Sequence, residues 1–272
     1  LGFDLAHLHE LNPGLVVLRV TGFGQDGPYA RRPGFATLAE AMSGFASICG
    51  EPGGAPLLPP IALTDEITGL VGAFAILAAL WERQTSGLGQ EIDVNLLDTM
   101  VQMMGPLIAA FTDSGYLQPR MGSSLPYSVP RGTYRTADDR WIALSASAEP
   151  VARRLFAHLG VGDDPRFADH ASRAAHREEV DAVVAQWIGA RTAAEVLAEC
   201  EAIDAAAAEV YSVADLVADP HVQARGMLTT VGGLTMQGLI ARFSRTPGAI
   251  RSTAPALGAD TDTFDDWADA TT

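Results

Sequence analysis

Residues 67–81 contain no charged side chain, and two acids, Asp65 and Glu66, stand directly before this segment. Small residues and large apolar residues are mixed along the segment, so that bulky side chains fall on several faces of a helix. The uncharged run is shorter than the ~20 residues that a membrane-spanning helix needs. We therefore predict a helix over residues 64 to about 84 that is buried nearly all round in a protein core.

The acids at the start of this helix have two interpretations. Thr64 and Asp65 are good N-cap residues, and an Asp at a helix start is typically stabilised by ~0.3–1 kcal/mol. The second interpretation is catalytic, because a carboxylate at the mouth of a buried helix is partly desolvated and lies beside amide donors. These conditions suit a carboxylate nucleophile, and the amides also stabilise a neighbouring oxyanion. Glu66 points ~100° further around the helix and is expected to support Asp65 or to cap the helix.

Composition limits the partners that the chain can bind. The formal net charge of the 272 residues is -15, and the chain contains no Lys. The negative balance argues against nucleic acid as a partner, because phosphate binding needs clustered basic charge. A phosphorylated small molecule held by a few Arg side chains and backbone amides remains compatible with this charge. Cys49 and Cys200 match no metal-ligand spacing, and we expect reduced thiols.

Strand and helix patterns divide the chain into three predicted parts. Residues 1–120 are expected to form a large α/β domain, with strands near 15–20 and 91–94 and helices near 37–48, 64–84 and 96–113. Residues 121–220 are expected to form a linker and a small α+β domain, which begins with a hairpin around Asp138 and Asp139. Residues 221–272 then return to the large domain.

The stretch "GFGQDG" matches the dinucleotide-binding pattern, with Gly22, Gly24 and Gly27 at the required positions. That pattern works only when a helix begins at the third glycine and its N-terminus holds the pyrophosphate. Here Pro28 follows, and no helical pattern begins until about Thr37. The sequence therefore favours a glycine turn, or a loop whose backbone approaches a different ligand, over an NAD site.

Several longer motifs occur in a characteristic order along the chain. They read "NPGLVVLRVTGFGQDGPYARRPGF", "ALTDEITGLVGAFAILAALWERQTSGLGQEIDVNLLD", "VPRGTYRTADDRWIALSA", "DPRF", "DPHVQARGM" and "RFSRTPGAIRSTAPALG". Together they resemble class III CoA-transferases, the superfamily of formyl-CoA and carnitine CoA-transferases and of alpha-methylacyl-CoA racemase. The resemblance extends over residues 12–258.

The resemblance implies a fold and an assembly. It implies a Rossmann-like large domain built from both chain ends, with an inserted smaller α+β domain. It also implies a homodimer of interlocked chains. The two separate cysteines predict a cytoplasmic protein, and the negative charge and the short uncharged run predict that neither nucleic acid nor a membrane is a partner. Members of this family carry further residues before the point that matches Leu1, so we expect an N-terminally truncated chain that lacks part of the CoA site.

The resemblance also implies a chemistry and its residues. The nucleophilic Asp of the family matches Asp65, and the loop beside CoA matches Thr21, Gly22, Phe23 and Gly24. The implied reaction is CoA transfer from an acyl-CoA donor to a small carboxylic acid through an aspartyl mixed anhydride and an aspartyl-CoA thioester. Coenzyme A is the co-substrate, and no metal is implied.

Two further sets of residues are candidates for contacts with substrate. Arg31 and Arg32 are the cations nearest to the glycine loop and are interpreted either as solvated or as partners of a phosphate or carboxylate. Gly122 and Ser123 are interpreted as a plain linker or as a mobile loop that covers the site.

The racemase branch and an inactive family member are the alternatives to transfer. Racemases of the family pair the Asp with a His, and Phe35 and Ala36 stand in the matching stretch here. None of the six His residues lies between His9 and His158, and a two-base proton transfer needs a second base. The sequence therefore favours transfer, although many transferases have an Asp where this chain has Ala36. A truncated, non-catalytic chain is the other alternative.

Overall fold

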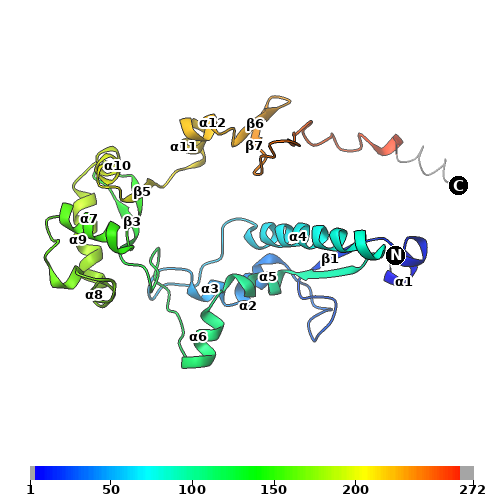
Figure 1. Cartoon of the computed structure of the whole chain (residues 1–272), viewed down its shortest axis with the longest axis horizontal. Coiled ribbons are helices and arrows are strands. Elements are labelled where there is room, and N and C mark those ends of the chain that lie inside the picture. Colours follow the sequence, from blue (N-terminus) through cyan, green and yellow to red (C-terminus); the bar gives the residue numbers. More distant parts are fainter. Residues whose placement is uncertain (1–3, 264–272) are drawn as a thin grey trace. The chain divides into compact units, whose positions relative to one another are not determined.

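The computed structural model describes residues 4–263, and the chain divides into two compact units, Leu1–Ala208 and Glu209–Thr272 (Figure 1). The first unit opens with α1 (Leu5–Leu11) and then forms a two-stranded parallel sheet. Strand β1 (Val17–Thr21) pairs with β2 (Glu91–Asn95), and the last residues of both strands, Thr21 and Asn95, are partners. Both strands therefore end at the same edge of the sheet.

Two helical segments near this sheet are divided where the sequence pattern predicts continuous helices. The helix predicted near 37–48 is divided into α2 (Ala36–Met42) and α3 (Phe45–Ile48), because Gly44 between them has φ 94°. The helix predicted near 96–113 is divided into α5 (Leu96–Met103) and α6 (Leu107–Ser114). Gly105 with φ 56° and the following Pro106 interrupt it.

Helix α4 (Leu63–Ser86) has 24 residues and is the last helix of the connection between the two strands, and it buries only one narrow face. That face consists of small residues, Thr64, Thr68, Gly72 and Ala79. A Cβ at Gly72 would stand 2.9 Å from Leu18 Cδ2 of β1, so the helix approaches the sheet closely through this face.

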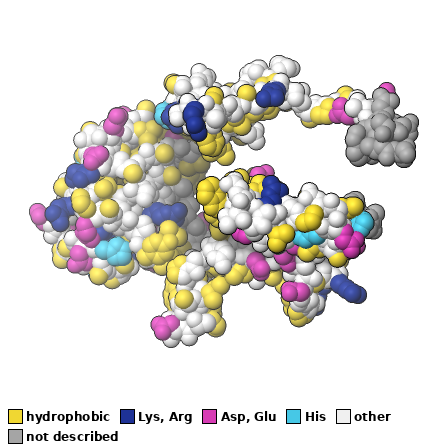
Figure 2. Space-filling view, turned by 45° about the vertical axis from the view of Figure 1, so that its right-hand side comes forward, with side chains coloured by type: hydrophobic (Ala, Val, Ile, Leu, Met, Phe, Trp, Pro, Cys, Tyr) yellow, Lys and Arg dark blue, Asp and Glu magenta, His cyan; other side chains and the backbone are white. Residues whose placement is uncertain are grey.

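Several large residues of α4 point outward, and the expectation of burial all round is wrong. Phe74 and Trp81 are each 75% exposed, and Leu70 and Leu77 are each 66% exposed. Close packing through small residues explains this, because the bulky positions are then left on the opposite face. Hydrophobic side chains reach the surface over much of the face in Figure 2. By length and composition alone, α4 is the one described helix long and apolar enough to cross a membrane.

The second half of the first unit is an α+β assembly. Its sheet has the order β3 (Arg131–Arg135), β4 (Trp141–Ser145), β5 (Ala206–Glu209), and β3 and β4 are antiparallel. The predicted hairpin is confirmed, and Asp139 in its turn has φ 62°. Strand β5 was not predicted, because three consecutive Ala residues carry no alternating pattern. The helices are α7 (Glu149–His158), η1 (Pro165–Phe167), α8 (His170–Ala175), α9 (Arg177–Gly189) and α10 (Ala193–Ala202).

The core of this half lies between the sheet and the helices. Tyr134, Ile142 and Leu144 alternate along β3 and β4 and pack against α7, α9 and α10. The buried Arg173 donates hydrogen bonds to the carbonyl oxygens of Val129, Phe167 and Ser147 and forms an ion pair with Glu149 at 2.8 Å. A single guanidinium thus satisfies backbone acceptors from several segments.

The second unit contains short elements. They are α11 (Val213–Ala218), α12 (Pro220–Ala224), β6 (Leu228–Val231) and β7 (Leu234–Gln237). The two strands are antiparallel and are joined by Gly232 and Gly233, which have φ 57° and 80°. Positive φ at both central residues suits a tight hairpin turn. The division at residues 121 and 221 stays a prediction.

Candidate active site

A cavity of about 550 Å³ lies at the carboxyl ends of the parallel strands. Thr21 and Gly22 line it from the end of β1, and Leu96 lines it from the first residue after β2. In α/β proteins, ligands bind outside the carboxyl ends of the strands, because loops and helix starts gather there. Asp65 lines this same cavity, from the start of α4.

Three helices begin at the cavity. Ala36 is the first residue of α2, Asp65 lies in the first turn of α4, and Leu96 is the first residue of α5. Among the described residues that line the cavity, the ionisable side chains are Glu40 and Asp65, and both are acids. The amide ends of helices carry partial positive charge, so the helix starts offset the two carboxylates and favour a bound anion.

Asp65 occupies the third position of α4, and the expectation that Thr64 and Asp65 cap the helix is wrong. The helix begins at Leu63, its N-cap is Ala62, and no side chain caps it. The backbone N–H groups of Thr64 and Asp65 belong to the first turn, which has no intrahelical acceptor for them. Asp65 is exposed, so the prediction that its carboxylate is partly desolvated is wrong. Large residues beside it on α4 face outward as well, so this end of the helix is open. The carboxylate therefore stands in an open cavity beside backbone donors.

Glu40 is a site residue that the sequence interpretation missed. It lies on α2, is 3% exposed, and accepts a hydrogen bond of 2.9 Å from Thr64 Oγ1. The signal was present, because Glu40 is the one charged residue in the stretch 37–48. A charge inside an otherwise apolar helical stretch indicates either an exposed face or a functional group.

The glycines of "GFGQDG" have local structural roles. A Cβ at Gly22 would stand 2.6 Å from Gly34 Cα, so the two backbones touch. Gly24 has φ 91°, and a Cβ there would stand 3.4 Å from Asp93 Oδ2. The Gly24 N–H donates to Thr21 Oγ1 at 2.9 Å, and the Gln25 N–H donates to Asp93 Oδ2 at 2.8 Å. These contacts hold the loop in a turn, and no helix begins at Gly27.

The four predicted loop residues divide into two groups. Thr21 and Gly22 line the cavity of Asp65, and the Leu97 N–H donates to the Gly22 carbonyl at 3.2 Å. Phe23 and Gly24 do not line it. The ring of Phe23 packs edge-on against Tyr29, with 5.8 Å between the ring centroids.

Neither arginine near the loop lines the cavity. Arg31 and Arg32 are exposed, and the guanidinium of Arg32 lies 3.9 Å from the centroid of the Tyr29 ring. This distance is within the range of a cation–π contact. A role for either residue in substrate binding stays a prediction.

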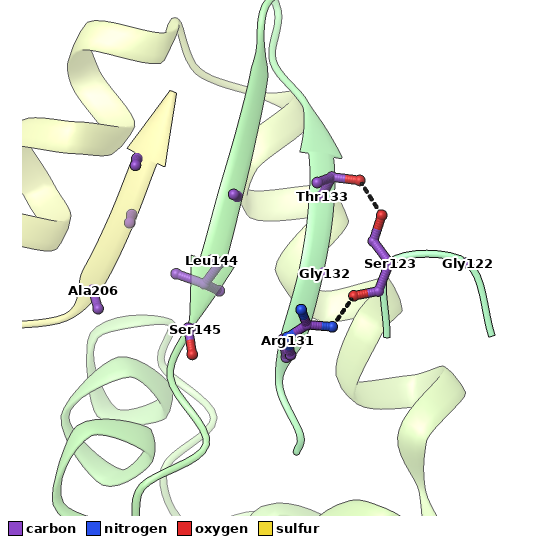
Figure 3. Close-up of a pocket in the computed structure, with 11 residues that line it drawn as sticks. Gly122, Ser123, Arg131, Gly132, Thr133, Leu144, Ser145 and Ala206 are labelled. Carbon is purple, nitrogen blue, oxygen red and sulfur yellow. Dashed lines mark hydrogen bonds between the residues drawn. The ribbon is translucent and has the colours of Figure 1, made fainter. Parts of the chain in front are cut away.

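Gly122 and Ser123 lie at a different cavity, of about 570 Å³, on the sheet of the α+β half (Figure 3). Ser123 Oγ and Thr133 Oγ1 are 3.0 Å apart, and Arg131 Nη1 donates to the Ser123 carbonyl at 2.5 Å. The Gly122 N–H donates to the Gly50 carbonyl at 2.9 Å. The residues that line this cavity do not include Asp65, so the structure does not bring the loop to Asp65.

The described residues contain no group of three or more His, Cys, Asp or Glu side chains that is placed to hold a metal ion. Cys49 and Cys200 are free thiols, and burial raises the pKa of both.

Comparison with known proteins finds similarity to CoA-transferases. The model of "CoA-transferase family III" matches residues 1–261. The chain is 35% identical to succinyl-CoA–D-citramalate CoA-transferase of Chloroflexus aurantiacus and 35% identical to succinate–glutarate CoA-transferase of Agrobacterium fabrum. Each alignment includes 94% of this chain and 66% of the relative, so the chain spans slightly less than two thirds of their length.

Solved structures agree with this similarity and confirm the predicted α/β fold class. A CAIB/BAIF family protein from Brucella suis matches with a TM-score of 0.84 and 31% identity, over 98% of this chain and 71% of that chain. The family match over residues 1–261 and the identities of 35% lead to one conclusion. The chain belongs to CoA-transferase family III.

Proposed function

We propose that the chain belongs to an acyl-CoA:carboxylate CoA-transferase in which Asp65 is the nucleophile. The observation that carries the proposal is the position of Asp65 in the first turn of α4, in one cavity with Thr21 and Gly22. Family membership supports CoA thioesters as substrates. We also propose that the enzyme is cytoplasmic and, from the family resemblance, that it is an interlocked homodimer.

The proposed reaction begins with attack of an Asp65 carboxylate oxygen on the thioester carbon of the acyl-CoA donor. The new C–O bond forms, the C–S bond breaks, and CoA leaves as a thiolate from a mixed anhydride. The thiolate then attacks the Asp65 carbonyl and releases the donor carboxylate, which leaves an aspartyl-CoA thioester. The acceptor carboxylate repeats the sequence in reverse, takes the CoA and regenerates Asp65.

The start of α4 is suited to stabilise the charge that develops in these steps. Each attack places a negative charge on a carbonyl oxygen next to Asp65, and first-turn N–H groups of a helix are preorganised donors for such an oxygen. Because no cationic side chain lines the cavity among the described residues, backbone amides supply the positive end of the local field in this proposal.

Small carboxylic acids are the proposed acceptors. The relatives are named for succinyl-CoA with D-citramalate, and for succinate with glutarate. A cavity of about 550 Å³ is large enough for a small carboxylic acid next to a thioester. Thr21 and Gly22 are proposed to lie beside the thioester, because both line this cavity together with Asp65.

A racemase that moves the α-proton of a 2-methylacyl-CoA is the second candidate, and Glu40 is the observation that favours it. A two-base reaction needs a second ionisable group in the cavity, and Glu40 is one. Its Oε1 is engaged by Thr64, and the residue is 3% exposed, which leaves it poorly placed to exchange protons with a substrate. Deuterium exchange at the α-carbon without an acceptor acid separates the two reactions.

Trapping of the acyl-enzyme tests the proposed function. The intact enzyme is incubated with succinyl-CoA and then with hydroxylamine, and the peptide that contains Asp65 is examined by mass spectrometry. We expect a hydroxamate on Asp65, and we expect Asp65→Ala to lose both the hydroxamate and the transfer of CoA to an acceptor acid. Full transfer activity in Asp65→Ala would refute the assignment.

A further inference from the structure

A hydrogen bond between two buried side chains joins α2 to the first turn of α4. Thr64 Oγ1 donates to Glu40 Oε1 at 2.9 Å, and Thr64 and Glu40 are 0% and 3% exposed. The two residues are 24 positions apart in the sequence, so the bond connects separate elements. Thr64 is the residue directly before Asp65.

The start of α4 has no capping side chain, because its N-cap residue is Ala62. Within the described part of the chain, the Asp65 carboxylate has no hydrogen-bond partner of its own, and the residue is exposed. The direction of Asp65 therefore depends on its backbone, which the buried neighbour Thr64 holds in place.

Thr64 makes one hydrogen bond to another helix and one within its own helix, and only the first anchors α4 to a separate element. Its hydroxyl binds Glu40, and its carbonyl accepts a hydrogen bond of 2.7 Å from Thr68 Oγ1, one turn further along the helix. Glu40 is costly in its position, because a buried carboxylate loses hydration and needs a donor in return. An apolar residue would fill the same place without this cost, as Ala39 does beside it at 1% exposure.

We infer that Glu40 is a positioning residue, which orients Asp65 through the buried hydrogen bond to Thr64. The inference rests on the proposed role of Asp65 as nucleophile. Glu40 itself does not need to touch the substrate. Its carboxylate holds the Thr64 side chain, and Thr64 holds the backbone from which the Asp65 carboxylate projects into the cavity.

The bond matters for rate because nucleophilic attack requires close alignment. A shift of ~1 Å in a reacting group costs up to ~10²-fold in rate. Loss of the bond is therefore expected to lower kcat and to leave KM for the acyl-CoA nearly unchanged, because CoA binding does not involve Thr64 or Glu40 in this proposal.

A set of variants tests the inference in the intact enzyme. Thr64→Val and Glu40→Leu remove the bond, whereas Thr64→Ser and Glu40→Gln keep a donor and an acceptor. We expect kcat to fall ~10- to 100-fold in the first pair and to recover most of that loss in the second pair. Thr68→Val is the matched control, since Thr68 is a buried threonine of the same helix whose hydroxyl binds only its own helix.

The double variant Thr64→Val with Glu40→Leu distinguishes positioning from general loss of packing. If both residues act through one bond, the double variant is no slower than the slower single variant. Independent losses that multiply would overturn the inference, and so would a fall in kcat for Thr68→Val equal to that for Thr64→Val. Circular dichroism confirms that each variant is folded, and Thr64→Ser supports the conclusion if Glu40→Leu fails to fold.

A readout that does not depend on activity separates this inference from the proposed function. Amide hydrogen exchange in the peptide with residues 63–70 measures how firmly the first turns of α4 are held. We expect faster exchange in Thr64→Val than in Thr64→Ser. If Asp65→Asn stays active while exchange still depends on Thr64, the nucleophile is wrong and the anchoring holds. If Asp65→Asn is inactive while Thr64→Val changes neither exchange nor kcat, the anchoring is wrong.

Discussion

Gly22 shows at the level of one residue how a sequence motif is formed by unrelated requirements. Its backbone touches that of Gly34, because a Cβ on either residue would stand 2.6–2.7 Å from the Cα of the other. Gly24 instead needs its positive φ of 91°. The G-x-G-x-x-G spacing thus arises from close backbone contact and from turn geometry, and neither requirement involves a pyrophosphate.

Gly22→Ala is therefore expected to destabilise the protein and to disturb the cavity. The added methyl group meets backbone atoms, which cannot move aside as a flexible side chain does, and we expect a loss of ~1–3 kcal/mol in the free energy of unfolding. Urea unfolding measures it. Gly27→Ala is the control, because a methyl group added there would meet no neighbouring atom within 4 Å and only its φ of 82° carries a cost. Equal losses for both variants would contradict the contact.

Asp65 and Glu40 mark the limit of sequence interpretation at the residue scale. The family motif identified Asp65, but the residues around it suggested that the start of the helix is buried. Asp65 is exposed in the structure. Glu40 stands out as the one charged residue of its stretch, but its partner Thr64 is 24 residues away in sequence. A contact between elements has no local signal, so the sequence identifies the acid without showing what it binds.

At the scale of elements, α4 shows why a helix pattern predicts existence better than burial. The predicted range, 64–84, agrees to within a few residues with the observed helix, Leu63–Ser86. Its small residues suggested burial on every side, but only some of them form the buried face, where Gly72 meets Leu18 of β1, while Gly69, Ala73 and Ala78 are exposed. Periodicity shows where small side chains lie but not which neighbour they meet.

Two glycines of α4 provide a matched test of this packing. A Cβ added at Gly69 would meet no neighbouring atom within 4 Å, whereas a Cβ at Gly72 would lie 2.9 Å from Leu18 Cδ2. Gly69→Ala is expected to stabilise the protein by ~0.5–1 kcal/mol through helix propensity alone. Gly72→Ala gains the same propensity but displaces Leu18, so it should be less stable than Gly69→Ala by ~1 kcal/mol or more. Thermal unfolding of both variants measures the difference, and a Gly72→Ala protein as stable as Gly69→Ala would contradict the close approach.

Turn residues and glycines account for the hairpin turn and for the helix breaks, whereas the Ala-rich composition around β5 predicts no definite element. The hairpin of β3 and β4 was predicted from its Asp-Asp turn, and Asp139 has a positive φ there. Gly44 and Gly105 divided two helices that were predicted as continuous, because a glycine inside a helical pattern does not reveal its φ. Strand β5 lies in an Ala-rich run, which is compatible with helix or strand, so only pairing with β4 decides its state.

At the scale of the whole molecule, the net negative charge causes repulsion, while many individual acids have local partners. The chain carries a formal charge of -15, which favours expansion at neutral pH. Yet many acids between residues 138 and 219 are paired with arginines or cap helices. Hydrogen bonds and nearby charges hold the pKa of each of these carboxyls below its ordinary value: Asp138, Glu149, Asp164, Asp169, Glu195, Glu199 and Asp219.

These lowered pKa values predict how stability depends on pH. Arg166 lowers the pKa of Asp164 to about 2, and hydrogen bonds from Arg173 lower the pKa of Glu149. Since the folded state binds protons less tightly than the unfolded state, the contribution of each group is complete above its unfolded pKa, near ~4, and is lost as the pH falls through its folded pKa. Asp181 acts in the opposite direction, because burial raises its pKa, but it is one group against many.

We therefore expect the urea midpoint to be nearly constant from pH 7 to about pH 5 and to fall steeply below ~pH 4.

Added salt at pH 7 should raise the midpoint, since it screens the net repulsion of -15 charges. Asp164→Asn removes one of the depressed carboxyls, whose ion pair with Arg166 is partly exposed. The variant should therefore lose a modest amount of stability at pH 7, approach the stability of the unsubstituted protein at low pH, and show a smaller slope of stability against pH below ~pH 4. A midpoint that rises on acidification through this range would mean that repulsion outweighs the local pairs, and that the caps and ion pairs of residues 138–219 do not control the acid stability of the protein.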